Sequence, residues 1–296
     1  MKEIQVEGCN FYIVDVFAEN KYEGNQLAVF VCNEPQSEET MQKIANEMHY
    51  SETVFITSID DHNIRIFTPE VELPFAGHPT LGAAYILQRE YIKEKIKTLS
   101  LNMKIGEIAV LFKYKGEDVN VMWMEQKEPI FLGYIAPEII SKVLNIEEEE
   151  IDGRFHVQEV STGVPFIIVP LKNLATIKRA RLNRELYFEF IEKTQAKSIL
   201  MFCPETYNKQ NDLNARVFCE AIGITEDPAT GSGNGCLAAY LVRHEYFGKK
   251  RVDIRVEQGY EIDRKSLLYL RAEKKENKYY ISVGGSAKLI AKGKLL

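Results

Sequence analysis

Short runs of β-branched and aromatic residues, separated by turn residues, dominate the hydrophobic pattern of the chain and are typical of strands. In the first half, the pattern predicts strands near residues 11–17, 26–32, 53–57, 64–68 and 108–114. In the second half, it predicts strands near residues 155–160, 166–171, 198–202, 214–218, 252–256, 267–272, 279–283 and 287–291. We therefore expect a strand-rich α/β protein of the α+β kind.

Only a few segments have a helical pattern. Residues 37–48 open with a capping serine followed by acids, and their apolar residues fall on one face. Residues 79–89 begin with proline and are apolar nearly all round, which indicates a buried helix. A third helix, rich in small residues, is expected from about 233 to 246, with Gly248 as its stop.

An internal repeat links two of these helices. The sequence Pro-Phe-Ala-Gly-His-Pro at 74–79 aligns with Pro-Ala-Thr-Gly-Ser-Gly at 228–233, so that proline matches proline and glycine matches glycine. Each segment opens an alanine-containing helix. The repeat suggests two lobes derived from one ancestral half, each with a central buried helix. The acidic stretch 145–153 is the most polar candidate linker.

Composition narrows the range of partners. The 296 residues, 45% of them hydrophobic, are enough for one large domain or two lobes. With 37 basic and 43 acidic residues, a net charge of -6 and no basic stripe, the chain lacks a nucleic-acid footprint. It also lacks a membrane-spanning apolar run and a targeting signal. We expect a cytoplasmic protein that binds a small molecule.

The five cysteines are scattered and have no Cys-x-x-Cys spacing, which argues against a disulfide framework and a zinc site, so reduced thiols are expected. The histidines show no short metal-ligand spacing. The glycine-rich run at 231–235 lacks the lysine of a nucleotide-binding loop and matches only part of a serine-hydrolase elbow. No metal and no nucleotide cofactor is predicted.

Two glycine-led helix starts, Gly77-His78 and Gly231-Ser232, are candidates for anion binding. The first N–H groups of a helix have no intrahelical partner and the helix dipole is positive there. Two such starts facing each other across a cleft would clamp a carboxylate. Ordinary capping is the alternative for either start taken singly, but their matched places in a repeat favour a functional role.

Glu52 is the candidate proton carrier. Strand alternation places it on the same face as Val54 and Ile56, where desolvation would raise its pKa toward neutrality. The alternative is a glutamate at a strand end that bends into solvent. His78 and Asp227 have equally ordinary alternatives, as a packed or capping histidine and as a turn aspartate. Local pattern alone does not decide between these interpretations.

Together these motifs resemble the PhzF-like phenazine-biosynthesis isomerases, which share the diaminopimelate-epimerase fold. The resemblance spans nearly the whole chain and rests on several long motifs in the family's order. They are Asp15-Val16-Phe17, Gly24-Asn25-Gln26-Leu27-Ala28-Val29, Ser51-Glu52-Thr53-Val54-Phe55, residues 67–82, Thr162-Gly163-Val164-Pro165-Phe166, residues 226–232, Gln258-Gly259 and residues 283–287.

The resemblance implies two pseudo-symmetric lobes, each with strands wrapped round a central helix. The N-terminal lobe would be 1–125 with the C-terminal strand 280–296 returning to it, and the C-terminal lobe 126–279. It also implies a homodimer and a cofactor-independent isomerase or tautomerase that moves a proton on a small anionic carboxylate, as with trans-2,3-dihydro-3-hydroxyanthranilate.

The resemblance further implies that Glu52 is both base and acid. The other implied catalytic residues are His78, Asp227 and Ser232, and the implied substrate-binding residues are Gly77, Thr230 and Gly231. Related epimerases use a thiol at each helix start; here Ala76 and Thr230 occupy those positions, which disfavours a two-thiol racemase. An amino- or hydroxy-acid epimerase and a non-catalytic carboxylate-binding protein of the same fold stay open as alternatives.

Overall fold

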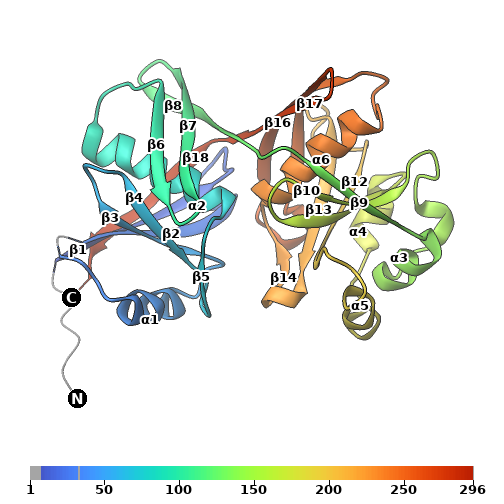
Figure 1. Ribbon diagram of the computed structural model, residues 1–296, viewed down its shortest axis with the longest axis horizontal. Coiled ribbons are helices and arrows are strands. Elements are labelled where there is room, and N and C mark those ends of the chain that lie inside the picture. Colours follow the sequence, from blue (N-terminus) through green and yellow to red (C-terminus); the bar gives the residue numbers. More distant parts are fainter. Residues whose placement is uncertain (1–7, 33, 296) are drawn as a thin grey trace. The chain divides into compact units, whose positions relative to one another are not determined.

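The computed structural model describes residues 8–32 and 34–295, which form two compact units (Figure 1). The first unit extends to Met124 and includes the segment from Gly284 onward. The second unit runs from Glu125 to Val283. Each unit is described by itself below.

The first unit is built from a sheet in the order β18-β1-β2-β3-β4-β6-β7-β8. Neighbouring strands are antiparallel except β2 with β3 and β4 with β6. The strands are β1 (Cys9–Val16), β2 (Asn25–Cys32), β3 (Thr53–Ser58), β4 (Asn63–Phe67), β6 (Thr98–Met103), β7 (Gly106–Lys115), β8 (Asp118–Glu125) and β18 (Ala287–Lys294), with the short β5 (Glu72–Leu73) beside β4.

The second unit repeats this topology. Its strands follow the order β9-β10-β11-β12-β13-β15-β16, and the parallel pairs, β11 with β12 and β13 with β15, stand in the same places. The strands are β9 (Ile130–Ile135), β10 (Val157–Ser161), β11 (Pro165–Pro170), β12 (Ser198–Cys203), β13 (Leu213–Cys219), β15 (Arg251–Gln258), β16 (Ser266–Lys275) and β17 (Lys278–Gly285), with β14 (Ile224–Asp227) beside β13. The internal repeat predicted from sequence is thus a repeat of strand order and direction.

A central helix fills each unit. In the first, α2 (Gly77–Ile86) is buried at every residue and contacts β1, β2, β3, β6, β7 and β18. In the second, α6 (Gly231–Arg243) packs on β10, β11, β15 and β16 (Figure 1). A Cβ at Gly82 would meet the side chains of Leu27 and Val16, so glycine allows α2 to pack closely on the sheet. The predicted fold class, strands wrapped round a central helix, is confirmed.

Both central helices begin earlier than their apolar patterns predict. The predicted helix 79–89 starts at Gly77 and continues beyond Ile86 as a π-helical segment, Leu87–Ile92. The predicted helix 233–246 starts at Gly231 and ends at Arg243. Glycine and histidine carry no apolar signal, so periodicity misses the first turn that the repeat had indicated.

The outer helices were predicted only in the first unit. There α1 (Glu38–Met48) begins after Ser37, whose side chain accepts a hydrogen bond from the Thr40 N–H. Met41 and Ile44 of α1 pack into an aromatic core with Phe30 and Phe55. The second unit has three outer helices that the sequence reading missed because each has only six to eight residues: α3 (Pro137–Leu144), α4 (Leu174–Arg179) and α5 (Arg184–Ile191).

The acidic stretch 145–153 does not link the two units. It lies within the second unit, where Glu148–Glu150 form a 3-10 turn and Ile151 pairs with Leu171. Its polarity reflects an exposed turn rather than a boundary.

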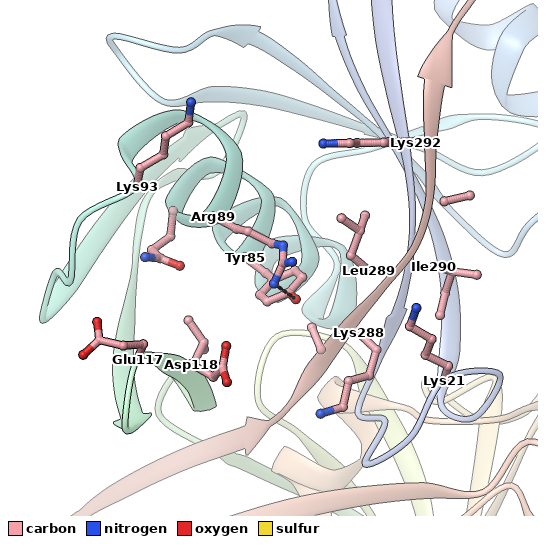
Figure 2. A pocket seen from close by; sticks show the side chains of 14 residues that line it. Lys21, Tyr85, Arg89, Lys93, Glu117, Asp118, Lys288, Leu289, Ile290 and Lys292 are labelled. Atoms are coloured by element: carbon pink, nitrogen blue, oxygen red, sulfur yellow. Dashed lines mark hydrogen bonds between the residues drawn. The ribbon is translucent and has the colours of Figure 1, made fainter.

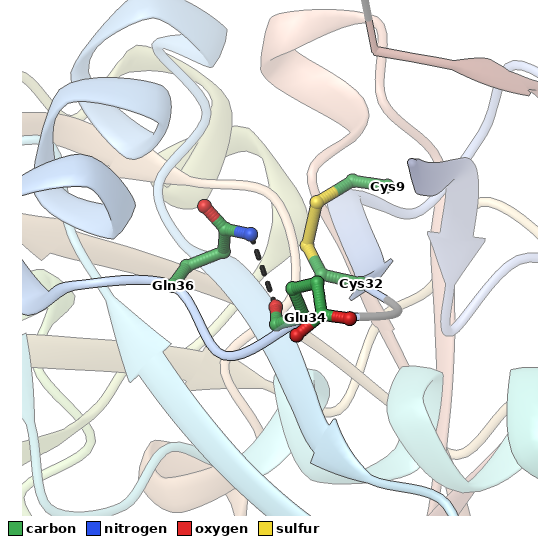
Figure 3. Close-up of a disulfide and its surroundings, with 4 residues drawn as sticks. All are labelled: Cys9, Cys32, Glu34 and Gln36. Carbon is green, nitrogen blue, oxygen red and sulfur yellow. Dashed lines mark hydrogen bonds between the residues drawn. A yellow bond between two sulfur atoms is a disulfide. The ribbon is translucent and has the colours of Figure 1, made fainter. Parts of the chain in front are cut away.

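The expectation of reduced thiols is wrong for one pair of cysteines. Cys9 and Cys32 face each other in the antiparallel register of β1 and β2 and form a disulfide (Figure 3). Cys203, Cys219 and Cys236 are buried free thiols. The pairing depends on strand register across 23 residues, which cysteine spacing alone does not reveal. Among the described residues, no helix is long and apolar enough to cross a membrane.

Candidate active site

Glu52 lies immediately before β3, at the edge where two parallel strands begin. Ala28 of β2 is level with Thr53 of β3, so Asn25 at the start of β2 lies near Ser51 and Glu52. The next residues of β3 on the same alternation, Val54 among them, are fully buried. Thr53 and Phe55, on the opposite face of β3, are buried as well, so alternation alone does not determine the surroundings of Glu52.

The Glu52 carboxyl meets His78 from the first turn of α2. Its Oε2 lies 3.5 Å from His78 Nε2, and only 15% of the Glu52 side chain is exposed. Burial raises the pKa of Glu52 to about 7, although its contact with Ser51 acts in the opposite direction. A carboxyl group with this pKa exists in both protonation states near neutral pH, as general acid–base chemistry requires.

Asn25 connects His78 to the residue before Glu52. Asn25 Nδ2 lies 3.4 Å from His78 Nδ1, and Ser51 Oγ donates to Asn25 Oδ1 across 3.4 Å. Asn25 is 2% exposed, and Gly24 before it has a φ of 72° with the Val16 carbonyl only 2.3 Å from where a Cβ would lie. In the sequence, Asn25 is marked only by its place in the motif Gly24-Asn25-Gln26-Leu27-Ala28-Val29, and its contacts with Ser51 and His78 depend on the fold.

The start of α2 has no side-chain cap. Its N-cap residue, Ala76, has no side chain that can accept a hydrogen bond, and the first turn contains no acidic residue. The N–H groups of Gly77 and His78 have no intrahelical acceptor, and Pro79 has no N–H. A side-chain cap is therefore not the role of Ala76 at this helix start, and anion binding stays a prediction.

The start of α6 is arranged differently. Its N-cap residue, Thr230, also makes no side-chain cap; its hydroxyl donates instead to Asp227 Oδ2, at the end of β14. Asp227 and Thr230 are both buried, whereas Ser232 in the first turn of α6 is half-buried. The structure thus brings Asp227, Thr230 and the Gly231-Ser232 turn together within the second unit.

Gln258, at the end of β15, holds this arrangement and was not predicted. Its Nε2 donates to the Asp227 carbonyl at 2.7 Å and to Thr230 Oγ1 at 3.0 Å. Its Oε1 accepts from the Thr230 N–H and from Asn234 Nδ2. The side chain therefore makes four hydrogen bonds, and the Gln258-Gly259 motif was the only signal of it in the sequence.

The two helix starts share one further contact. Thr80 Oγ1 donates to the Ala76 carbonyl at 2.7 Å in α2, and Asn234 Nδ2 donates to the Thr230 carbonyl at 3.0 Å in α6. Thr80 and Asn234 hold the same place after their N-cap residues. The repeat thus extends to the side chains that fix the first turns.

No free cysteine lies at either helix start in the described part of the chain, because the N-cap residues are Ala76 and Thr230. Cys236 lies within α6, where burial raises the pKa of its thiol to about 11. A thiol with this pKa remains protonated and does not serve as a base at neutral pH.

A separate cavity of about 710 Å³ lies in the first unit, between β18, the start of β8 and the end of the α2 helix (Figure 2). None of the predicted site residues lines it. Arg89 donates to the Tyr85 hydroxyl at 3.2 Å on one side, and Lys288 and Lys292 extend from β18 on the other. Lysines along a strand edge discourage pairing with another chain, which gives this charge a structural explanation.

Comparisons with known proteins show the family of this chain. Residues 14–293 match the phenazine biosynthesis-like protein family (PhzC-PhzF). The trans-2,3-dihydro-3-hydroxyanthranilate isomerase of Pseudomonas aeruginosa is 30% identical, with 96% of this chain and 98% of that protein covered.

Solved structures of other proteins are also similar to this chain. A PhzF-family phenazine biosynthesis protein of Bacillus anthracis has a TM-score of 0.89 at 27% identity, covering 97% of this chain and 98% of that one. A hydroxyproline epimerase of Agrobacterium vitis shares the fold alone, with a TM-score of 0.62 at 8% identity over 96% of this chain and 91% of that one. The chain therefore belongs to the phenazine biosynthesis-like (PhzF) family of isomerases and has the epimerase-like fold of that family.

Proposed function

We propose that this isomerase moves a proton between two carbons of a small carboxylate substrate, without a cofactor, and that Glu52 carries the proton. The observation that carries the proposal is the Glu52 carboxyl, whose side chain is 15% exposed and whose Oε2 lies 3.5 Å from His78 Nε2, at a start of α2 that has no side-chain cap. Its pKa of about 7, raised by burial, allows it to accept and to return a proton at neutral pH.

The reaction needs only one such group. The Glu52 carboxylate takes a proton from a substrate carbon, and the electron pair of the broken C–H bond enters the adjacent conjugated system. Protonated Glu52 then gives its proton to a second carbon of that system, and a double bond moves between the two positions. Substrate and product are isomers, so no oxidant or reductant is consumed.

The helix start beside Glu52 suits the substrate's carboxylate. The N–H groups of Gly77 and His78 donate to an anion there, and the helix dipole favours its negative charge. In the second unit, Ser232 and Asp227 stay predicted catalytic residues and Gly231 a predicted substrate-binding residue. Thr230 holds Asp227 in place, because its hydroxyl donates to Asp227 Oδ2. The Thr230 N–H donates to Gln258 Oε1, so both groups of Thr230 already have partners.

A one-base mechanism fits these residues better than two-thiol racemisation. Alanine and threonine stand at the N-cap positions, Ala76 and Thr230. The 30% identical Pseudomonas aeruginosa relative is named for an isomerisation of trans-2,3-dihydro-3-hydroxyanthranilate. We therefore choose this dihydroaromatic amino acid as the first substrate to test.

The test follows this compound with the purified protein in heavy water by NMR. The proposal expects a migrated double bond, with one carbon gaining hydrogen either from solvent or from the substrate's own C–H bond. Loss of chirality at one carbon without migration would instead show an epimerase. Binding detected by thermal stabilisation, with neither migration nor label, would contradict catalysis and favour a binding protein.

A further inference from the structure

We infer that Asn25 is a positioning residue that fixes His78 as a neutral imidazole with its proton on Nε2, directed at Glu52. The observation is the series of contacts Ser51–Asn25–His78–Glu52, which joins the starts of β2 and β3 to the first turn of α2. The inference deepens the proposed function and rests on it, because it says what His78 does while Glu52 carries the proton.

The groups that face the two nitrogens of His78 determine where its proton lies. An ionised carboxylate only accepts hydrogen bonds, so its Oε2 is matched by an N–H on the nearest histidine nitrogen, Nε2 of His78. A neutral imidazole with its proton on Nε2 has a bare Nδ1, which needs a donor. Asn25 Nδ2, 3.4 Å from Nδ1, is that donor.

The other end of the Asn25 amide agrees with this orientation. Its Oδ1 accepts from the Ser51 hydroxyl, so donor and acceptor of the amide both have partners. Because Asn25 is 2% exposed, turning the amide would place two acceptors against each other or require the other histidine tautomer. Ser51 and Glu52 are consecutive residues, so the series of contacts begins and ends beside the start of β3.

The end of the Asn25 amide that faces Nδ1 decides the role of the histidine, and in the structure this end is Nδ2. A carboxylate or carbonyl beside Nδ1 would hold the proton there and leave Nε2 free to act as a base, as in a catalytic triad. An amide N–H beside Nδ1 instead donates a hydrogen bond to that nitrogen, so the proton of the neutral imidazole stays on Nε2. With its proton on Nε2, His78 presents an N–H to Glu52 across the 3.5 Å contact, which is an approach of the two atoms and not a formed hydrogen bond, and does not compete with Glu52 for the substrate's proton.

The first measurement needs no substrate. NMR of the protein with ¹⁵N-labelled histidine reports which imidazole nitrogen carries the proton, and His78→Gln identifies the His78 signals among those of the other histidines. We expect protonated Nε2 and unprotonated Nδ1 at pH 7.5. A His78 imidazole with its proton on Nδ1 would overturn the inference even if Glu52 proves catalytic.

The second measurement changes Asn25. Asn25→Asp has the same shape but presents only acceptors, so we expect Nδ1 of His78 to gain a proton and the pH profile of kcat/KM to shift. Asn25→Ala should lower kcat about tenfold or more with KM nearly unchanged. Gln26→Ala, at the exposed neighbouring position, is the matched control. An unchanged His78 tautomer and pH profile in folded Asn25→Asp would overturn the inference.

Discussion

Glu52 Oε2 and His78 Nε2 lie 3.5 Å apart, where the beginning of β3 meets the first turn of α2. This contact joins two motifs that lie apart in the sequence, Ser51-Glu52-Thr53-Val54-Phe55 and residues 67–82. It puts a carboxyl group with a raised pKa beside a residue in the first turn of α2, where the helix N–H groups have no intrahelical acceptor. The predictions below test the energetic consequences of this arrangement and of its counterpart in the second unit.

The first prediction concerns stability and pH. Burial raises the pKa of Glu52 from 4.5 to about 7 in the folded protein, so between these values the folded state binds more protons than the unfolded state. Unfolding free energy therefore falls as pH rises through this range. Glu52→Gln, which is always neutral, should be more stable than wild type at pH 8 by up to about 3 kcal/mol, with little difference near pH 4.5.

Urea denaturation of both proteins at several pH values measures this effect. Glu47→Gln makes the same chemical change at an exposed position of α1 and should behave as wild type. A stability difference for Glu52→Gln that is independent of pH would show that the Glu52 carboxyl titrates at its ordinary pKa.

The second prediction concerns Gln258. Gln258→Ala removes four hydrogen bonds, leaves the buried Thr230 N–H without its acceptor and leaves Asn234 Nδ2 with the Thr230 carbonyl alone. We expect a loss of about 2–3 kcal/mol in unfolding free energy, since unsatisfied buried groups cost about 1–3 kcal/mol each. Denaturant melts compare it with Gln210→Ala, an exposed glutamine of the same unit. Equal unfolding free energies for the two variants would mean that the Gln258 hydrogen bonds do not stabilise the start of α6.

The third prediction concerns the disulfide. Linking Cys9 to Cys32 closes a loop of 23 residues, and loops of about this length contribute about 3 kcal/mol to unfolding free energy. Reductant should therefore lower the melting temperature of wild type. The Cys9→Ala, Cys32→Ala double variant should melt lower than oxidised wild type and be insensitive to reductant. Equal sensitivity in both proteins would place the effect on another thiol.

Much of the fold could be predicted because it depends on local sequence patterns. The sequence predicts the strands, the burial of the α2 helix and the repeat that includes Gly77 and Gly231. The three short helices of the second unit were not, because six to eight residues give too little periodicity. The disulfide was missed for a different reason, since it depends on which residues of β1 and β2 lie opposite each other.

The candidate site was predictable in part. Glu52 and His78 stood in separate motifs, and only the packing of α2 against the sheet brings them to 3.5 Å. Asn25 and Gln258 act through hydrogen bonds to residues distant in sequence, so no local pattern gives them a role. Helix starts and burial can be read from sequence, whereas side-chain networks require the fold.

The most direct test of the central claim compares Glu52→Gln with wild type and Glu47→Gln, following isomerisation of trans-2,3-dihydro-3-hydroxyanthranilate in heavy water by NMR. Removing a general acid–base group typically costs about 10²–10⁴-fold in rate. The account predicts a loss of this size, in both double-bond migration and labelling, for Glu52→Gln alone, with the variant folded and still able to bind the substrate. Migration at the wild-type rate in folded Glu52→Gln would contradict the assignment of Glu52 as the proton carrier.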